Sequence, residues 1–357
     1  MLTYVVMPCL DEADLIEGAI ASLGFITGAA PPDAHFIAVD NGSSDGTLDI
    51  LARLRDRDPS RIYLFHERER GFVPPRRRGV AAASELAGKA GADPTAVLVL
   101  QADADTIYKA GYVAAMQAAV DRGVMLEGAT RRPPDFEAVH PSYVAAERLV
   151  DNKVEPLQAK DEDEVVVDDK VCGFLLADYL LWGGLFEEIA PSGDRIHAET
   201  TRMFIRAKLR HSARKIRVNP AGAASSRRRV AEDPWLHYAT VGFPREASWL
   251  RSRGHWAQTT TSDIDAFAER VLRGGEPEAV RLRRAHQLAL FRYLPALVDS
   301  LGPRSNDLEL LDDVMAVLAA LPLRSADEVA TSPSLALMDV LSLIDVQPGL
   351  LAGAPPT

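Results

Sequence analysis

The sequence is poor in cysteine and contains no long apolar run. It has two cysteines, Cys9 and Cys172, among 357 residues, which excludes a disulfide scaffold and fits a reducing compartment. A helix that crosses a bilayer needs roughly 18–20 apolar residues, and the best candidate, residues 171–186, is interrupted by glycines and an aspartate. The chain starts without a basic region followed by an apolar core, so we expect no signal peptide. These absences favour a cytoplasmic protein without a transmembrane segment, and they leave peripheral membrane contact open.

The chain also has fewer basic than acidic residues. Lysine and arginine total 40 against 51 acidic residues, which gives a net charge of −11. An acidic chain of this kind does not bind nucleic acid over a broad surface. Its arginines are concentrated locally, at residues 76–78 and 227–229, and this pattern fits a small anionic ligand better than a long polyanion.

What the sequence does have, in its first half, is alternation of strands and helices. Short apolar runs predict strands at residues 4–7, 35–39, 61–65, 97–100 and 124–129. The segments between them predict helices at residues 11–23, 48–54, 75–89 and 109–121. Alternation with short connections implies parallel pairing and right-handed crossovers. We therefore predict an α/β fold with a doubly wound, mostly parallel sheet whose strand ends meet at one ligand crevice.

Two carboxylates, Asp103 and Asp105, follow the apolar run at residues 97–100. Side chains alternate along a strand, so both can point the same way just past its carboxyl end. Close carboxylates repel each other unless a cation lies between them, and Mg²⁺ or Mn²⁺ suits such oxygen ligands. The pair predicts a metal–diphosphate site. The alternative is that one aspartate caps the next helix and the other is solvated.

Four segments fall into an order that resembles a known family. They are VVMPCLDE (5–12), VDNGSSDGT (39–47), GFVPPRRRG (71–79) and LQADAD (100–105). In this order they resemble the nucleotide-sugar domain of family 2 glycosyltransferases, which are inverting enzymes with the GT-A fold. The resemblance covers residues 3–130 well and residues 171–229 more loosely.

The resemblance implies a GT-A type, Rossmann-like domain organisation. A glycosyltransferase domain is expected at residues 1–230, with a nucleotide-sugar half at 1–130 and an acceptor half at 131–230. Helical periodicity dominates beyond about residue 230 and predicts a helical region at 231–357. Its predicted helices are residues 264–272, 279–297, 308–321 and 326–344, with Pro295 and Pro333 as candidate breaks in two of them.

The resemblance also implies a donor site at the strand ends. Asp40 matches the aspartate that holds uracil in the family, which favours a UDP-sugar; its alternative role is that of a turn residue. Pro8 and Glu12 match the region that lines the nucleotide pocket. Arg76 matches an arginine that meets base, ribose or phosphate groups, whereas three consecutive arginines can also form a solvated face.

Metal and diphosphate contacts follow from the same resemblance. Asp103 is expected at the ribose or the metal, and Asp105 at an Mn²⁺ or Mg²⁺ ion bound to the diphosphate. Such a metal stabilises charge on the departing nucleoside diphosphate. Arg227, in the basic stretch 227–229, is expected to reach the diphosphate or else to belong to a solvated patch.

The catalytic base is the least settled part of the resemblance. The family supplies it from a Glu-Asp pair that opens a helix, and here Glu199 takes the place of the glutamate. Thr200 takes the place of the aspartate and cannot serve as a base. Either Glu199 or Asp194 does this work, or activity is lost; Glu199 can also be a helix-capping residue.

The sequence thus predicts a metal-dependent, inverting glycosyltransferase that moves a sugar from a nucleotide-sugar to an acceptor hydroxyl. The acceptor, whether carbohydrate, lipid or small molecule, is not identified. Trp235, His237 and Trp249 could line its pocket or simply pack in the core. One alternative is a nucleotide-sugar-binding protein without transfer activity, because of Thr200. Another alternative is a sugar-1-phosphate nucleotidyltransferase. It is less favoured, because that class has a glycine-rich loop near its amino terminus and residues 7–10 of this chain contain no glycine.

Overall fold

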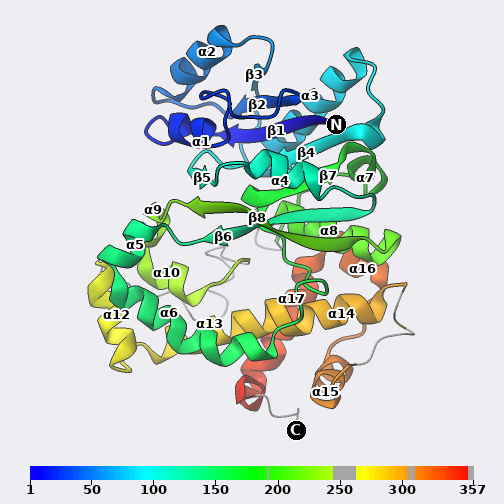
Figure 1. Cartoon of the computed structure of the whole chain (residues 1–357). Helices are drawn as coiled ribbons and strands as arrows, with labels where there is room; N and C mark the ends of the chain where they lie inside the picture. The colour runs from blue at the N-terminus through cyan, green and yellow to red at the C-terminus, as the bar shows by residue number, and fades with distance from the viewer. Residues whose placement is uncertain (191–192, 244–262, 304, 306–309, 353–357) are drawn as a thin grey trace.

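The computed structural model describes the chain except for residues 191–192, 244–262, 304, 306–309 and 353–357. Its strands form one eight-stranded sheet, and helices cover both faces and one edge (Figure 1). In spatial order the strands are β3 (Ile62–His66), β2 (Ala34–Asp40), β1 (Leu2–Cys9), β4 (Val97–Gln101), β7 (Cys172–Leu175), β6 (Val124–Arg131), β8 (Arg214–Ser225) and β5 (Thr106–Tyr108).

The first four strands are parallel because each is joined to the next by a helix. The connecting helices are α1 (Ile16–Ser22), α2 (Thr47–Arg57) and α3 (Val73–Lys89). Residues of β1 alternate between two cores: Val5 packs with α1 and α2, and Val6 packs with α3 on the other face. A strand buried on both faces reads as a continuous apolar run. The predicted doubly wound α/β fold is thereby confirmed.

The helix predicted at residues 11–23 begins later than expected, at Ile16. The polar residues before it are bonded to the turn after β2 instead. The Asp11 carboxylate accepts a hydrogen bond from the Ser44 backbone at 2.6 Å, and the Glu12 backbone N–H donates to Thr47 Oγ1 at 2.8 Å. These contacts hold together the loops at the carboxyl ends of β1 and β2.

The second half of the sheet contains pairings that simple alternation does not predict. β7 runs antiparallel between β4 and β6, and the short β5 runs antiparallel along the end of β8. β6 and β8 pair in parallel. Helices α7 (Leu176–Leu181) and α8 (Glu199–His211) join α3 on its face of the sheet, and α4 (Tyr112–Ala118) joins α1 on the opposite face.

The described residues beyond 230 are helical, as the sequence predicts. The helices are α9 (Arg228–Glu232), α10 (Pro234–Ala239), α12 (Ile264–Leu272), α13 (Pro277–Leu288), α14 (Leu294–Leu301), α15 (Asp312–Ala320), α16 (Ala326–Thr331) and α17 (Pro333–Val346). Pro333 divides the last predicted helix, since it begins α17 where its missing N–H is tolerated. Pro295 lies in the first turn of α14, which follows α13 through the π-helical segment Ala289–Tyr293. None of the described helices is long and apolar enough to pass through a bilayer.

The carboxyl-terminal helices share one core with α5 (Pro134–Val139) and α6 (Pro141–Val154). Tyr143 and Val150 of α6 are buried against residues of α10, α12 and α13, while Ile205 and Leu209 connect α8 to the same core. In Figure 1 this layer lies below the sheet, with α13 and α14 running along its length. The chain division predicted at residue 230 stays a prediction.

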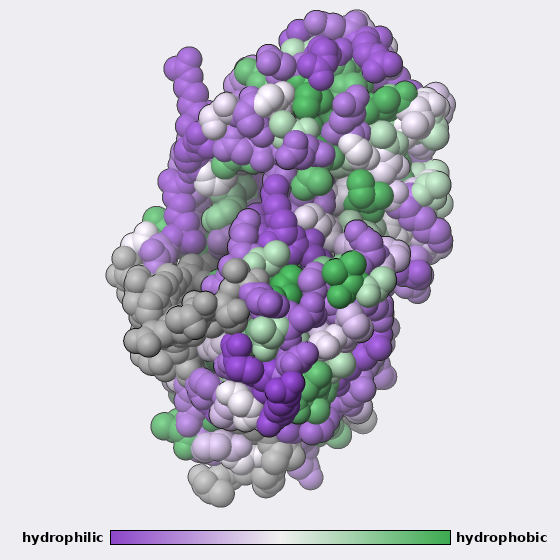
Figure 2. Space-filling view, turned by 90° about the vertical axis from the view of Figure 1, so that its left-hand side faces the viewer, coloured by the Kyte–Doolittle hydropathy of each residue, from purple (hydrophilic) through white to green (hydrophobic). Residues whose placement is uncertain are grey.

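The carboxyl ends of β1 and β8 point to one side of the molecule, the left-hand side of Figure 1. Figure 2 shows that side face on. Hydrophilic residues cover most of it, and apolar residues occur in small, separate groups.

Candidate active site

A buried arginine joins three elements at the carboxyl end of the sheet. Arg76 lies near the start of α3 and is 6% exposed. Its Nε donates to Glu199 Oε1 at 2.8 Å, its Nη1 to Gln101 Oε1 at 2.8 Å and its Nη2 to Asp103 Oδ1 at 2.7 Å. A planar guanidinium presents donors in fixed directions and can hold three acceptors at once. The sequence-predicted residues Arg76, Asp103 and Glu199 therefore meet in one cluster.

The charges in this cluster stabilise one another. Burial alone disfavours the Arg76 cation, but the carboxylates of Asp103 and Glu199 outweigh burial and raise the pKa of Arg76. Glu199 is 2% exposed, so Arg76 compensates a carboxylate that has almost no contact with water. Its three protein partners give Arg76 a structural role, and its contact with a ligand stays a prediction.

The start of α8 is tied to β4 and to the segment before β7. Thr200 Oγ1 accepts from Gln101 Nε2 at 3.1 Å, while the Thr200 backbone N–H donates to Asp169 Oδ1 at 3.2 Å. Ala198, which precedes the helix, has φ 72° in the left-handed region and supplies no side-chain cap. Asp169 thus satisfies a backbone donor that the helix start leaves open.

Sequence reasoning missed Asp169, because the six acids within residues 160–170 predict a solvated loop or a charged edge strand. In the structure this segment is partly buried instead, with Val165 and Val167 inside the core. Burial, followed by the nearby charge of Glu199, raises the pKa of the Asp169 carboxyl, and Arg76 opposes that rise. The available signal was the run of three valines, residues 165–167, between acidic residues, but it does not say which acid turns inward.

Asp103 and Asp105 lie just past β4, as predicted. Tyr108 Oη accepts from the Asp103 backbone N–H at 2.9 Å, and the Asp105 carbonyl accepts from the Ser226 backbone N–H at 2.8 Å. Burial and the charge of Asp103 raise the pKa of Asp105, whereas Arg228 opposes this rise. A cation bound between the two carboxylates would offset the free-energy cost of ionising Asp105 beside Asp103, so the residues fit a divalent metal.

Asp103 and Asp105 alone would supply only part of a metal's coordination. Among the described residues, no group of three or more histidine, cysteine, aspartate or glutamate side chains is arranged to hold an ion. Two carboxylates with the remaining positions open match Mg²⁺-like sites, where substrate phosphate and water complete the shell.

Arg228 lies beside Glu12 and Asp105, and the contact predicted between Arg227 and a diphosphate stays a prediction. Arg228 forms an ion pair with Glu12, and its charge also acts on Asp105. The Arg227 guanidinium lies over the ring of Phe136, 5.5 Å from the centroid. Which of three adjacent arginines faces the site depends on where β8 ends, and the sequence alone does not fix that residue.

Glu12 itself retains an oxygen without a partner. Its Oε2 is buried and accepts no hydrogen bond from the described part of the chain. Burial raises the pKa of Glu12, and the Arg228 cation opposes this. A buried acceptor without a donor is rare unless a ligand or water completes it. This observation agrees with the predicted place of Glu12 in a nucleotide pocket.

Asp40 and Pro8 lie at neighbouring strand ends. Asp40 is 4% exposed, and its carboxylate accepts from the backbone N–H groups of Gly42 and Ser43, each at 3.1 Å. The turn role of Asp40 is therefore observed, and its contact with a base stays a prediction. Pro8 is partly exposed and lies opposite Val39 in the pairing of β1 with β2.

The other predicted residues lie outside this cluster or outside the described chain. The Asp194 carbonyl closes a turn by accepting from the Ala190 N–H at 2.8 Å. Trp235 is buried in the core of the helical layer. Trp249 falls outside the described residues.

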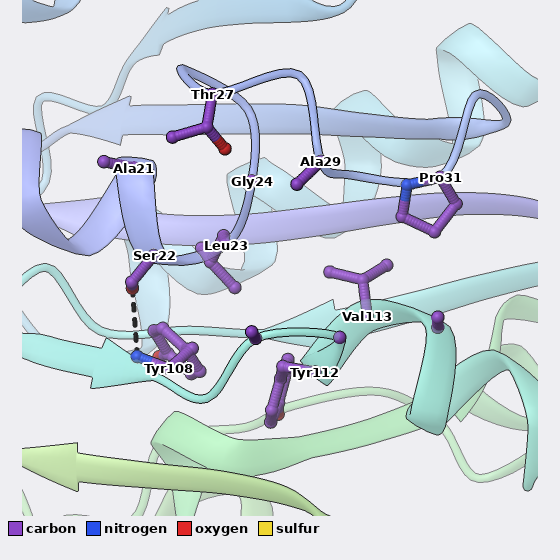
Figure 3. Close-up of a pocket in the computed structure, with 13 residues that line it drawn as sticks. Ala21, Ser22, Leu23, Gly24, Thr27, Ala29, Pro31, Tyr108, Tyr112 and Val113 are labelled. Carbon is purple, nitrogen blue, oxygen red and sulfur yellow. Dashed lines mark hydrogen bonds between the residues drawn. The ribbon is translucent and has the colours of Figure 1, made fainter.

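A separate cavity of about 260 Å³ lies between the end of α1 and the β5–α4 connection (Figure 3). Tyr108 is common to this cavity and to the cluster. Its ring lines the cavity, its backbone N–H donates to Ser22 Oγ at 2.9 Å, and its hydroxyl donates to the Lys170 carbonyl at 2.9 Å. Because that hydroxyl also accepts from Asp103, Tyr108 fixes the loop that carries the two aspartates.

Comparison with known proteins agrees with this geometry. Residues 4–156 match the model of the family described as glycosyl transferase family 2. Over 62 residues the chain is 39% identical to the succinoglycan biosynthesis protein ExoA of Rhizobium meliloti (strain 1021). That stretch is 17% of this chain and 18% of the relative, so the chain spans less than a fifth of the curated relative it matches.

Two solved structures are similar to the whole chain at low identity. One is the mannosyltransferase PcManGT from Pyrobaculum calidifontis in complex with GDP-Man and Mn²⁺, at 19% identity over 97% of this chain and 87% of that chain, with a TM-score of 0.46. The other is TarS 1–349 from S. aureus, at 13% identity over 84% and 86% of the two chains, with a TM-score of 0.44. Both TM-scores are below 0.5. The similarity to glycosyl transferase family 2 thus lies within residues 4–156, which is less than half of the chain.

Proposed function

We propose that this protein transfers a sugar from a nucleotide-sugar, most simply a UDP-sugar, to an acceptor hydroxyl with inversion at the anomeric carbon. One observation carries the proposal. The Arg76 guanidinium joins Asp103, at the donor side of the sheet, to Glu199, at the start of the helix where the family places its base. Donor and acceptor groups thus belong to one connected site.

The residues divide the work of donor binding. Asp40, Pro8 and Glu12 would surround the nucleotide, with the unpartnered Glu12 Oε2 as an acceptor for one of its donors. Asp103 and Asp105 would hold Mn²⁺ or Mg²⁺, which supplies Lewis-acid stabilisation of the departing diphosphate. Arg228 would meet the same diphosphate, because it already lies beside Glu12 and acts on Asp105.

The domain assignment is part of this proposal. Residues 1–130 bind the nucleotide-sugar, residues 131–230 form the acceptor side, and the helices of 231–357 support it. The acceptor is a carbohydrate, lipid or small molecule that offers a hydroxyl.

The test measures donor binding and turnover together. Titration calorimetry with UDP and with GDP, each with and without Mn²⁺, reports the nucleotide and the metal. Release of nucleoside diphosphate from UDP-glucose, UDP-N-acetylglucosamine and GDP-mannose reports turnover. We expect metal-dependent UDP binding that Asp105→Asn weakens at least about tenfold, while the exposed control Asp56→Asn does not. Absence of nucleotide binding under all of these conditions would contradict the proposal.

A second candidate function is nucleotide-sugar binding without transfer. It is favoured by Thr200, which stands where the family has its base, and by the engagement of Glu199 with Arg76. In that case UDP binds with Mn²⁺, yet no diphosphate is released from any donor. The family 2 match gives no support to the sugar-1-phosphate nucleotidyltransferase alternative.

A further inference from the structure

The start of α8 lacks a free carboxylate where the proposed reaction needs one. Thr200 has no acidic group, and its hydroxyl is already hydrogen-bonded to Gln101. Glu199 is 2% exposed and its Oε1 receives the Arg76 Nε at 2.8 Å. A carboxylate that is almost fully enclosed, with one oxygen held by a guanidinium, leaves little open surface that an acceptor hydroxyl could contact. Glu199 is therefore suited to positioning Arg76 rather than to accepting a proton.

Another element brings a carboxylate to the same place. β7 pairs antiparallel with β4, with Gly173 opposite Leu100, so the residues just before Cys172 reach the carboxyl end of β4. Asp169 comes from this stretch, and its Oδ1 lies 3.2 Å from the Thr200 backbone nitrogen. Unlike Glu199, Asp169 is partly exposed. It therefore lies against the very residue that lacks the acid and remains within reach of a substrate.

Charged groups from three neighbouring parts of the chain act on the Asp169 carboxyl. Glu199 of α8 and Asp103 after β4 disfavour its ionised form, and Arg76 of α3 favours it. On its own segment, Asp168 is paired with Lys170 at 2.6 Å. The net result, with burial as the largest cause, is a raised pKa for Asp169. A base becomes more effective as its pKa approaches the working pH.

We propose that Asp169 is the general base of this protein and replaces the aspartate that Thr200 has displaced. The inference rests on the proposed transfer function. The acceptor oxygen forms its bond to the anomeric carbon as the bond from that carbon to the diphosphate oxygen breaks. The bonding electrons leave with the nucleoside diphosphate, and the hydroxyl proton passes to the Asp169 carboxylate and then to solvent. Water can take the place of the acceptor, which gives donor hydrolysis by the same step.

A purely structural role is the competing explanation, since Asp169 also caps α8. Asp169→Asn separates the two roles, because an asparagine oxygen can still accept from Thr200 N–H but cannot take a proton. Asp163→Asn, at an exposed position of the same acidic segment, is the matched control. Asp169→Ala removes both the base and the cap.

The experiment measures diphosphate release from UDP-glucose, UDP-N-acetylglucosamine and GDP-mannose with Mn²⁺, from pH 5 to pH 9. For Asp169→Asn we expect kcat to fall about 100-fold or more, with donor KM, UDP affinity and melting temperature close to wild type. The rise of kcat with pH, which reports ionisation of the base, should disappear in this variant. Asp163→Asn should behave as wild type, and the double variant Asp169→Asn with Thr200→Asp should regain activity.

Two results overturn the proposal in different ways. If the wild type turns over a donor and Asp169→Asn keeps kcat within about threefold, or loses UDP affinity in proportion to kcat, Asp169 is not the base and the transferase function stands. If the wild type binds no nucleotide, or binds it without any turnover, the proposed transfer fails and this inference fails with it.

Discussion

At the scale of single residues, Arg76 shows how one side chain can hold a site together before any substrate arrives. Its guanidinium has separate acceptors in Gln101 and Asp103, at the end of β4, and in Glu199, about a hundred residues further along the chain. Lysine could not reproduce this arrangement, because an ammonium is a point charge without a planar fork. The arginine that the sequence suggests for a nucleotide thus also sets the distance between the donor and acceptor sides.

We predict that Arg76→Met destabilises the protein strongly. The substitution leaves the buried Glu199 carboxylate without its counter-ion, and breaking a buried pair in this way costs about 3–5 kcal/mol. Urea denaturation should show that loss as a lower midpoint with an unchanged slope. Arg77→Met, at the exposed neighbouring position, should change the free energy of unfolding by less than about 0.5 kcal/mol. A loss below about 1 kcal/mol in Arg76→Met would show that the three hydrogen bonds contribute little.

At the scale of elements, the acidic segment before β7 is fixed by a buried ion cluster. Lys215 of β8 is 3% exposed and donates to Glu127 Oε2 at 3.1 Å and to Glu164 Oε2 at 2.6 Å. It also donates to the Val166 carbonyl at 2.9 Å. This cluster attaches the segment that carries Asp169 to the two strands beneath it, so the position of Asp169 depends on Lys215.

We predict that Lys215→Met lowers stability by about 3 kcal/mol near neutral pH, and that the loss shrinks in acid. Burial already raises the pKa of Glu127 above its ordinary value of 4.5, while Lys215 lowers it. Without Lys215 the folded-state pKa rises further. When the pKa of an acid is higher in the folded than in the unfolded protein, its protonated form favours folding. That contribution to stability is complete below the unfolded-state pKa and is lost as the pH rises through the folded-state pKa. The difference in free energy of unfolding between Lys215→Met and wild type should therefore be small at pH 4 and large at pH 7.

Thermal unfolding at several pH values measures this difference. Lys153→Met, at an exposed position of α6, is the control and should show no such pH dependence. A loss for Lys215→Met that stays constant from pH 4 to pH 8 would contradict the assigned role of Glu127.

The elements also show what the sequence can and cannot predict. The strand ends carrying Asp40, Asp103 and Asp105 follow from local apolar runs and from the right-handed crossover rule, and their convergence is observed. Asp169 could not be placed in this way, because its position depends on the antiparallel register of β7 against β4. A long-range pairing of this kind leaves no periodic signal in its own segment. Which of Arg227 and Arg228 pairs with Glu12 is likewise set by where β8 ends.

At the scale of the whole molecule, the helical layer is joined to the sheet through α6 and α8. Arg283 of α13 is 5% exposed and donates to both carboxylate oxygens of Asp151 on α6, at 2.8 and 2.9 Å. It also donates to the Tyr238 carbonyl at 2.8 Å. The same arginine thus links segments on both sides of the predicted boundary at residue 230, within a shared apolar core.

This arrangement predicts one cooperative unfolding unit rather than two. Arg283→Met should lower the free energy of unfolding by about 3 kcal/mol, since Asp151 would lose both of its bonds to the guanidinium. In calorimetry both wild type and variant should show a single transition, and loss of UDP binding should follow the same curve as loss of helicity. Arg273→Met, just after α12, removes an exposed pair with Glu269 and should leave the transition unchanged. A different result would be an Arg283→Met unfolding curve with two transitions, in which UDP binding is retained after the first. The carboxyl-terminal helices would then be an independent domain. The acceptor side would have to be built from residues 131–230 alone.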